Sequence, residues 1–178
     1  MKTFELALML FAALTILIAS GCQGEAKKET RQKPDYDASR FVLTEEPADG
    51  LDVAAARKEV KDGEETVVIG RIGGSTRPWV EGRAAFDIVD PSLLACSDDK
   101  PDGATCSCPT PWDYCCESDK LPDAMASVRF VEEDGSVLKY DARDLFDLKE
   151  LQTVVIRGTA KRVEGNLTIL ANGIYVRK

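Results

Sequence analysis

Five cysteines are crowded into one short part of this sequence, within 21 positions of one another. Thiolates without imidazole suit soft or borderline metal centres, namely zinc, copper(I) or an iron–sulfur cluster. The C-S-C run at 106–108 brings two thiols together on a short turn, and an adjacent pair follows at 115–116. The pattern predicts a metal site on this cluster. The expected ligands are Cys106, Cys108, Cys115 and Cys116, with Cys96 as the fifth thiol or a substitute.

Disulfide bonds are the main alternative for the same thiols. An exported domain lies in an oxidising space, and a long irregular loop gains stability from cross-links. However, five is an odd number, so at least one thiol would be left over. A thiol redox site would need a cysteine of low pKa, usually in a C-x-x-C run. None is present, and acidic neighbours such as Asp98 and Asp113 would raise thiol pKa values instead.

Aromatic residues lie next to these thiols. Trp112 and Tyr114 alternate around Asp113, where they could keep water away from a metal. The simpler interpretation is that they anchor the loop to the rest of the domain. Trp79 allows the same two interpretations, as a binding surface or as a loop anchor.

The composition argues against catalysis and against nucleic acid as a partner. The chain has no histidine, which removes the usual general base, the Ser-His-Asp triad and most catalytic zinc sites. Asp87 alternates with Phe86 and Ile88, so a solvated face explains it better than an acid–base pair. The formal net charge of −8 would repel phosphate backbones and anionic lipids. We therefore expect a non-enzymatic protein.

The first residues are typical of an export signal. An apolar run from Leu6 to Ile18 follows Lys2 and ends in small residues. The run is too short to span a bilayer, which takes about 20 apolar residues. The sequence from Ala19 to Cys22 resembles the lipobox of bacterial lipoproteins. This resemblance implies that residues 1–21 are removed and that Cys22 carries fatty acyl chains such as palmitate; plain secretion is the alternative.

The same resemblance implies where the protein resides. Gln23 rather than aspartate follows the lipidated cysteine, which by analogy with enterobacterial sorting favours the periplasmic face of the outer membrane over the inner membrane. Residues 22–49 are polar, charged and proline-containing, so they predict a flexible tether with only the run at 41–43 able to bury side chains. Residues 50–178 are enough for one domain.

Alternating and β-branched runs predict a mainly β domain. Its five strands and one late helix resemble an OB-fold, a small Greek-key barrel; a β-sandwich or an SH3-like barrel is the alternative. The expected strands are 66–72, 84–89, 126–132 with a return at 137–140, 153–162 and 166–176; the expected helices are 53–60 and 142–151; a cysteine-rich insertion covers 92–122.

These features together predict a membrane-anchored extracytoplasmic binding module whose cysteine cluster holds a soft metal. A disulfide-stapled structural or envelope-interaction protein without metal is the alternative. The run Pro111–Cys116 also resembles uncharacterised envelope lipoproteins, which implies no activity. The membrane is the one partner implied, and a protein or small-ligand partner is not specified.

Overall fold

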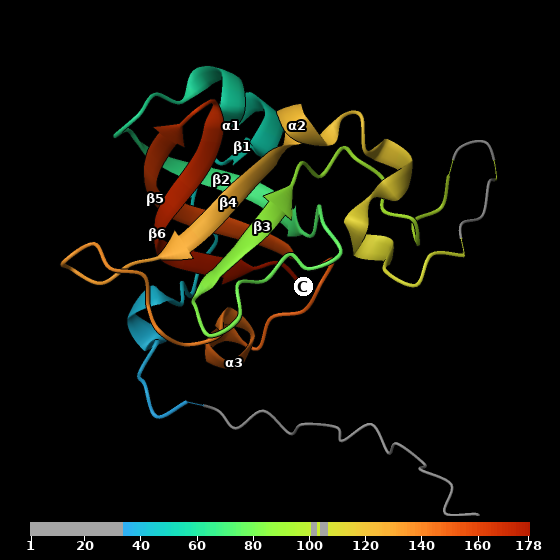
Figure 1. Ribbon diagram of the computed structural model, residues 1–178. Coiled ribbons are helices and arrows are strands. Elements are labelled where there is room, and N and C mark those ends of the chain that lie inside the picture. Colours follow the sequence, from blue (N-terminus) through green and yellow to red (C-terminus); the bar gives the residue numbers. More distant parts are fainter. Residues whose placement is uncertain (1–33, 101–102, 104–106) are drawn as a thin grey trace, which may run out of the picture. The chain divides into compact units, whose positions relative to one another are not determined.

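A computed structural model describes residues 34–100, 103 and 107–178 (Figure 1). The expected signal segment 1–21, Cys22 and Cys106 lie outside these residues. In the part that is described, no helix is long and apolar enough to cross a membrane.

Strands dominate the described chain, as the alternating runs predict. Five of them close into a barrel, because β2 pairs with β3 on one side and with β5 on the other. The circuit continues from β3 to β4, from β4 in parallel to β6, and from β6 back to β5. The strands are β1 Leu51–Asp52, β2 Glu65–Ile72, β3 Ala85–Val89, β4 Met125–Phe130, β5 Thr153–Val163 and β6 Asn166–Val176.

This closed arrangement, with helix α3 (Ala142–Phe146) between β4 and β5, confirms the expected OB-fold-like barrel. The two longest strands must bend to complete it. The register of β5 against β6 shifts between Arg157 and Gly158. A Cβ atom at Gly158 would lie 2.3 Å from the carbonyl oxygen of Leu170, so only glycine allows this close approach.

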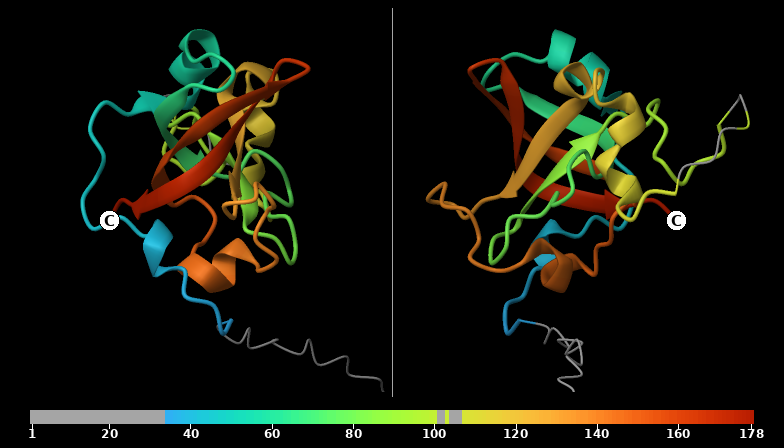
Figure 2. Two further views of the ribbon diagram at one scale, coloured as in Figure 1. Left: turned by 90° about the vertical axis from the view of Figure 1, so that its left-hand side faces the viewer. Right: turned by 45° about the vertical axis from the view of Figure 1, so that its right-hand side comes forward.

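The core fills the barrel with alternate residues of each strand. Phe86, Val128, Phe130, Ile156 and Ile169 are all buried to 1% exposure or less. The residues that alternate with them on β4 are more exposed, which gives that strand a period of two. Short helices cover the two ends: α1 (Val53–Glu59) and α2 (Leu121–Ala124) at one end, α3 at the other (Figure 2).

Two expected elements are shorter than the sequence pattern suggests. The helix expected over 142–151 ends at Phe146, because Asp147 adopts a left-handed conformation (φ 51°). Asp141 caps its start by accepting a hydrogen bond from the Arg143 N–H. The return at 137–140 makes only an isolated bridge, between Val131 and Val137.

Part of the segment expected as a tether, over residues 22–49, makes contacts with the barrel. A short 3₁₀ turn, η1 (Ser39–Phe41), lies beside α3 (Figure 2). Phe41 is 4% exposed and packs edge-on against Phe130 at 5.4 Å between ring centroids. The Leu43 N–H donates to the carbonyl oxygen of Ile174. The apolar run at 41–43 thus covers one end of the barrel, and the folded part begins before Gly50.

Replacing Phe41 with alanine is expected to lower the free energy of unfolding by about 3–5 kcal/mol, because a buried ring is lost and a cavity remains. The matched control is Val42→Ala at the neighbouring residue, which is 53% exposed and should change stability by less than about 1 kcal/mol. Urea denaturation followed by tryptophan fluorescence measures both. Equal effects of the two substitutions would contradict the packing of this segment.

Candidate metal centre

The cysteine-rich insertion leaves the barrel at the end of β3 and returns through α2 (Figure 1). It has a small apolar core of its own, separate from that of the barrel. Tyr114 is fully buried in it, against residues from the end of β3 and from the start of the insertion. This second core consists of Val89, Leu93, Ala95, Tyr114 and Ala124.

The insertion docks on the chain that follows β2. The Gly74 N–H donates to the carbonyl oxygen of Trp112 at 2.8 Å, and the Trp112 indole N–H donates to the carbonyl oxygen of Thr76 at 3.3 Å. A Cβ atom at Gly73 would lie only 2.5 Å from the Trp112 oxygen. A residue with a side chain at position 73 would therefore push the insertion away from the barrel.

An ion pair fixes the first thiol. Arg71 of β2 donates two hydrogen bonds to the carboxylate of Asp98, at 2.5 and 3.2 Å. Asp98 also accepts from the N–H of Ala95, the residue before Cys96. The hydrogen bond from Arg71 is the main reason that the pKa of Asp98 lies below its usual value. This contact ties Cys96 to the barrel wall.

Four potential ligands converge next to this contact. The Sγ atoms of Cys96, Cys108 and Cys115 and a carboxylate oxygen of Asp113 all lie within 4.8 Å of one another. The Cys115 sulfur lies 3.2 Å from that of Cys96 and 3.5 Å from that of Cys108. A fourth sulfur, that of Cys116, lies 3.8 Å from Cys96.

These separations suit a single metal ion. The distances exceed the length of a disulfide bond, about 2.05 Å, and the structure joins none of Cys96, Cys108 and Cys115 in one. Zinc–sulfur bonds of about 2.3 Å in a tetrahedral site place neighbouring sulfurs about 3.8 Å apart. The observed 3.2 and 3.5 Å are a few tenths of an ångström shorter, so binding would spread the sulfurs slightly.

Two 3₁₀ turns, η2 (Pro111–Asp113) and η3 (Cys115–Glu117), turn the last thiols toward the first. Tyr114 joins them in a left-handed conformation (φ 54°). Asp113 stabilises the reversal, because one oxygen accepts from the Cys115 N–H at 3.0 Å and the other from the Thr110 hydroxyl at 2.8 Å. The two turns thereby carry both a carboxylate and a thiol to one point.

The close approach of the sulfur atoms disfavours ionisation of the thiols to thiolates. The hydrogen bonds with Cys96 and Cys108 raise the pKa of Cys115, and burial raises the pKa of Cys96. Two thiolates at this distance would repel each other, so each thiol holds its proton more strongly. A bound cation would displace these protons, so metal binding would release them.

The structure brings together some of the expected ligands and adds one. Cys108 and Cys115 lie in the cluster, Cys116 lies beside it, and Cys106 is outside the described residues. Cys96, expected only as a fifth thiol, is the buried member. Asp113 was expected only to raise the pKa values of the thiols. Its position two residues before Cys115 was the sequence signal that could have indicated a ligand.

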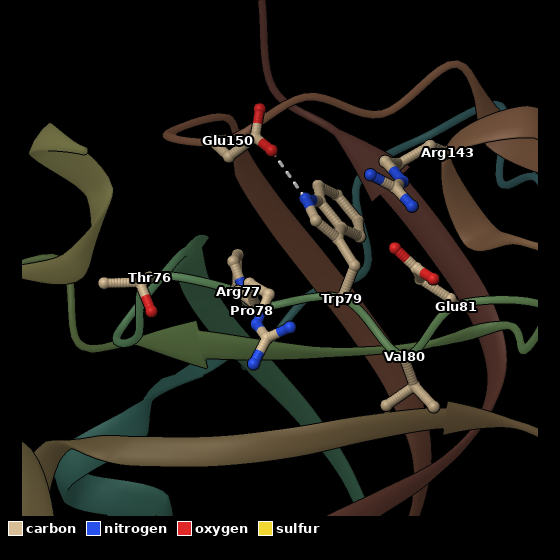
Figure 3. Close-up of a pocket in the computed structure, with 8 residues that line it drawn as sticks. All are labelled: Thr76, Arg77, Pro78, Trp79, Val80, Glu81, Arg143 and Glu150. Atoms are coloured by element: carbon tan, nitrogen blue, oxygen red, sulfur yellow. Dashed lines mark hydrogen bonds between the residues drawn. The ribbon is translucent and has the colours of Figure 1, made fainter. Parts of the chain in front are cut away.

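The aromatic residues anchor loops. Tyr114 fills the second core and Trp112 bonds to Thr76, so both attach the insertion to its surroundings. Trp79 is 9% exposed and donates from its indole nitrogen to Glu150 at 2.6 Å. It borders a separate open hollow of about 460 Å³ in which Arg143 lies over the Trp79 ring (Figure 3).

The alternation around Asp87 predicted a solvated face, but the face is only partly solvated. It is partly buried on β3, and its carboxylate accepts a hydrogen bond from the hydroxyl of Ser127 at 2.7 Å. Desolvation raises its pKa. Along the register of the described sheet it lies level with Ser127 of β4 and Thr168 of β6, neither of which is a carboxylate.

Comparison with known proteins gives no family. No family model and no curated protein matches this sequence. A solved structure described as "OBody AM1L10 bound to hen egg-white lysozyme" is similar over 76% of this chain and 98% of its own, with 15% identity and a TM-score of 0.39. A similarity at that level supports no conclusion about function.

Replacing Tyr114 with phenylalanine is expected to raise the free energy of unfolding by up to about 1 kcal/mol. Its hydroxyl is buried and has no hydrogen-bond partner within the described chain, and burial raises its pKa to about 12. The control is Tyr36→Phe, whose hydroxyl donates to Glu132 and should not be dispensable in the same way. Thermal unfolding measures both; a loss of stability in Tyr114→Phe would show that the hydroxyl has a partner in solution.

Proposed function

We propose that this protein is a membrane-anchored lipoprotein of the cell envelope that binds a metal ion through its cysteine cluster and catalyses no reaction. One observation carries the metal-binding part. Three sulfur atoms, of Cys96, Cys108 and Cys115, and a carboxylate oxygen of Asp113 lie within 4.8 Å of one another. Four donor atoms at that spacing can surround one ion.

The scaffold favours a preformed site over an accidental cluster of thiols. Arg71 fixes the chain before Cys96 through Asp98, and the Trp112 carbonyl fixes the chain before Cys115 through Gly74. Ligands held by such contacts lose little conformational entropy when the ion binds. The arrangement therefore supports binding rather than incidental proximity.

The exposure of the donors supports a site open to exchange. Cys96 is 3% exposed, whereas Cys115 lies at the surface and Cys108 is half-buried. Closed structural zinc sites surround the ion with protein on all sides. An ion bound here would keep one side toward solvent, which suits storage or transfer to a partner.

The anchoring part of the proposal rests on the first 22 residues. The apolar run and the lipobox-like sequence ending at Cys22 support export and acylation. The net charge of −8 gives the protein no attraction to anionic lipids, so the acyl chains would have to hold it at the membrane. The residue after Cys22 supports the periplasmic face of the outer membrane as the destination.

A disulfide-stapled interaction protein is the second candidate, because the sulfur atoms of Cys96 and Cys115 are only 3.2 Å apart. An oxidant that removed two hydrogen atoms could join them directly. That bond would consume two of the proposed ligands, so the two functions exclude each other in one molecule.

Metal binding is tested with the full chain carrying Cys22→Ser, in detergent and without oxygen. Elemental analysis is expected to find one ion per chain, and titration with zinc should saturate at that ratio. Cys108→Ser or Cys115→Ser, at residues that are not fully buried, should weaken binding at least about 100-fold, whereas Ser107→Ala on the same loop should not. No bound metal, together with an intact mass lowered by pairs of hydrogens, would support the stapled protein instead.

Lipidation is tested separately by growth with labelled palmitate. The wild-type chain is expected to incorporate label and to sediment with membranes. Cys22→Ser should abolish labelling, while Cys116→Ser, which also removes one thiol, should leave it unchanged. Labelling that persists in Cys22→Ser would contradict the proposed anchor.

A further inference from the structure

We propose that Asp113 is the fourth ligand of this centre and that it selects a divalent ion of the zinc type against copper(I). The inference rests on the proposed function and specifies its metal. Its starting point is that a carboxylate oxygen of Asp113 lies within 4.8 Å of each of the three sulfur atoms.

The carboxylate is oriented by its own hydrogen bonds. One oxygen accepts from the Cys115 N–H and the other from the Thr110 hydroxyl. A carboxylate oxygen has two lone pairs, so each can accept such a bond and still coordinate a metal. Ligating carboxylates in metal sites are generally held in this way by neighbouring donors.

The charge of Asp113 is not balanced by a basic side chain. Among the residues that the structure describes, no lysine or arginine forms an ion pair with it; Arg71, the cation at the base of the insertion, is engaged with Asp98. Its two oxygens instead accept from the Thr110 hydroxyl and the Cys115 N–H. No described basic side chain would therefore compete with a cation for this carboxylate.

The mixed donor set decides between the candidate ions. Zinc accepts cysteine sulfur and aspartate oxygen in the same tetrahedral site. Copper(I) is soft and selects thiolates or thioethers over carboxylate. Three thiolates and one carboxylate carry four negative charges, of which a divalent ion neutralises two and copper(I) only one.

The spacing also disfavours an iron–sulfur cluster. In such a cluster the cysteines bind separate iron atoms, so the cluster itself occupies the space between their sulfurs. Here Cys115 lies 3.2 Å from Cys96 and 3.5 Å from Cys108, which leaves room for one ion alone. Cys116 lies 3.8 Å from Cys96 but is not a member of the converging set.

Competitive titrations with chelators, on the full chain carrying Cys22→Ser without oxygen, test the inference. Asp113→Asn is expected to weaken zinc binding by about 10–100-fold while copper(I) affinity changes by less than about threefold. Cobalt(II) reports the ligands: its thiolate charge-transfer bands should persist in Asp113→Asn, and its visible ligand-field bands should shift. Asp119→Asn, an exposed acid on the same insertion, controls for the loss of one charge.

A second substitution separates ligation from folding. Thr110→Val keeps the carboxylate but removes one of its hydrogen bonds, so a smaller loss of zinc affinity is expected with unchanged thermal unfolding of the metal-free protein. Unchanged zinc affinity in Asp113→Asn, or an equal loss for zinc and copper(I), would overturn the inference while leaving metal binding intact. A wild-type chain that binds no metal would overturn the proposed function itself.

Discussion

The carbonyl oxygen of Trp112 and the backbone of Gly73 lie so close that residue 73 has no room for a side chain. The rest of the candidate site depends on this approach. It lets the Gly74 N–H bond to the Trp112 oxygen, and Tyr114, two residues further on, enters the second core. Cys115 then follows at a fixed distance from the barrel. Gly73 and Gly74, which follow β2, thus determine the position of the Cys115 thiol.

The same strand positions the other side of the site. Arg71 and Gly73 are two residues apart at the end of β2, and each holds one arm of the insertion. Cys96 and Cys115 are 19 positions apart, and they meet because both arms attach to this one strand end. The ion pair of Arg71 with Asp98 is partly exposed, so it contributes more to geometry than to stability.

Local patterns in the sequence were enough to predict the barrel, because each strand carries its own apolar alternation and the order of elements restricts the topology. Features created by tertiary contacts were not predictable in this way. Phe41 belongs to a short apolar run that was expected inside a flexible tether, and contacts with the barrel end and with Phe146 of α3 explain its burial. Asp113 looked like an acid that disturbs thiols, because the reversal at Tyr114 that turns it toward them is not encoded by periodicity.

The two cores have different roles: the larger one stabilises the barrel, and the smaller one supports the candidate metal site. The larger core fills the barrel, and the smaller core packs the insertion against the end of β3. The donor atoms all belong to the insertion, so a bound ion would cross-link its two arms. The free energy of binding would therefore stabilise the insertion rather than the barrel. The barrel can therefore serve as a rigid support for a site whose occupancy changes.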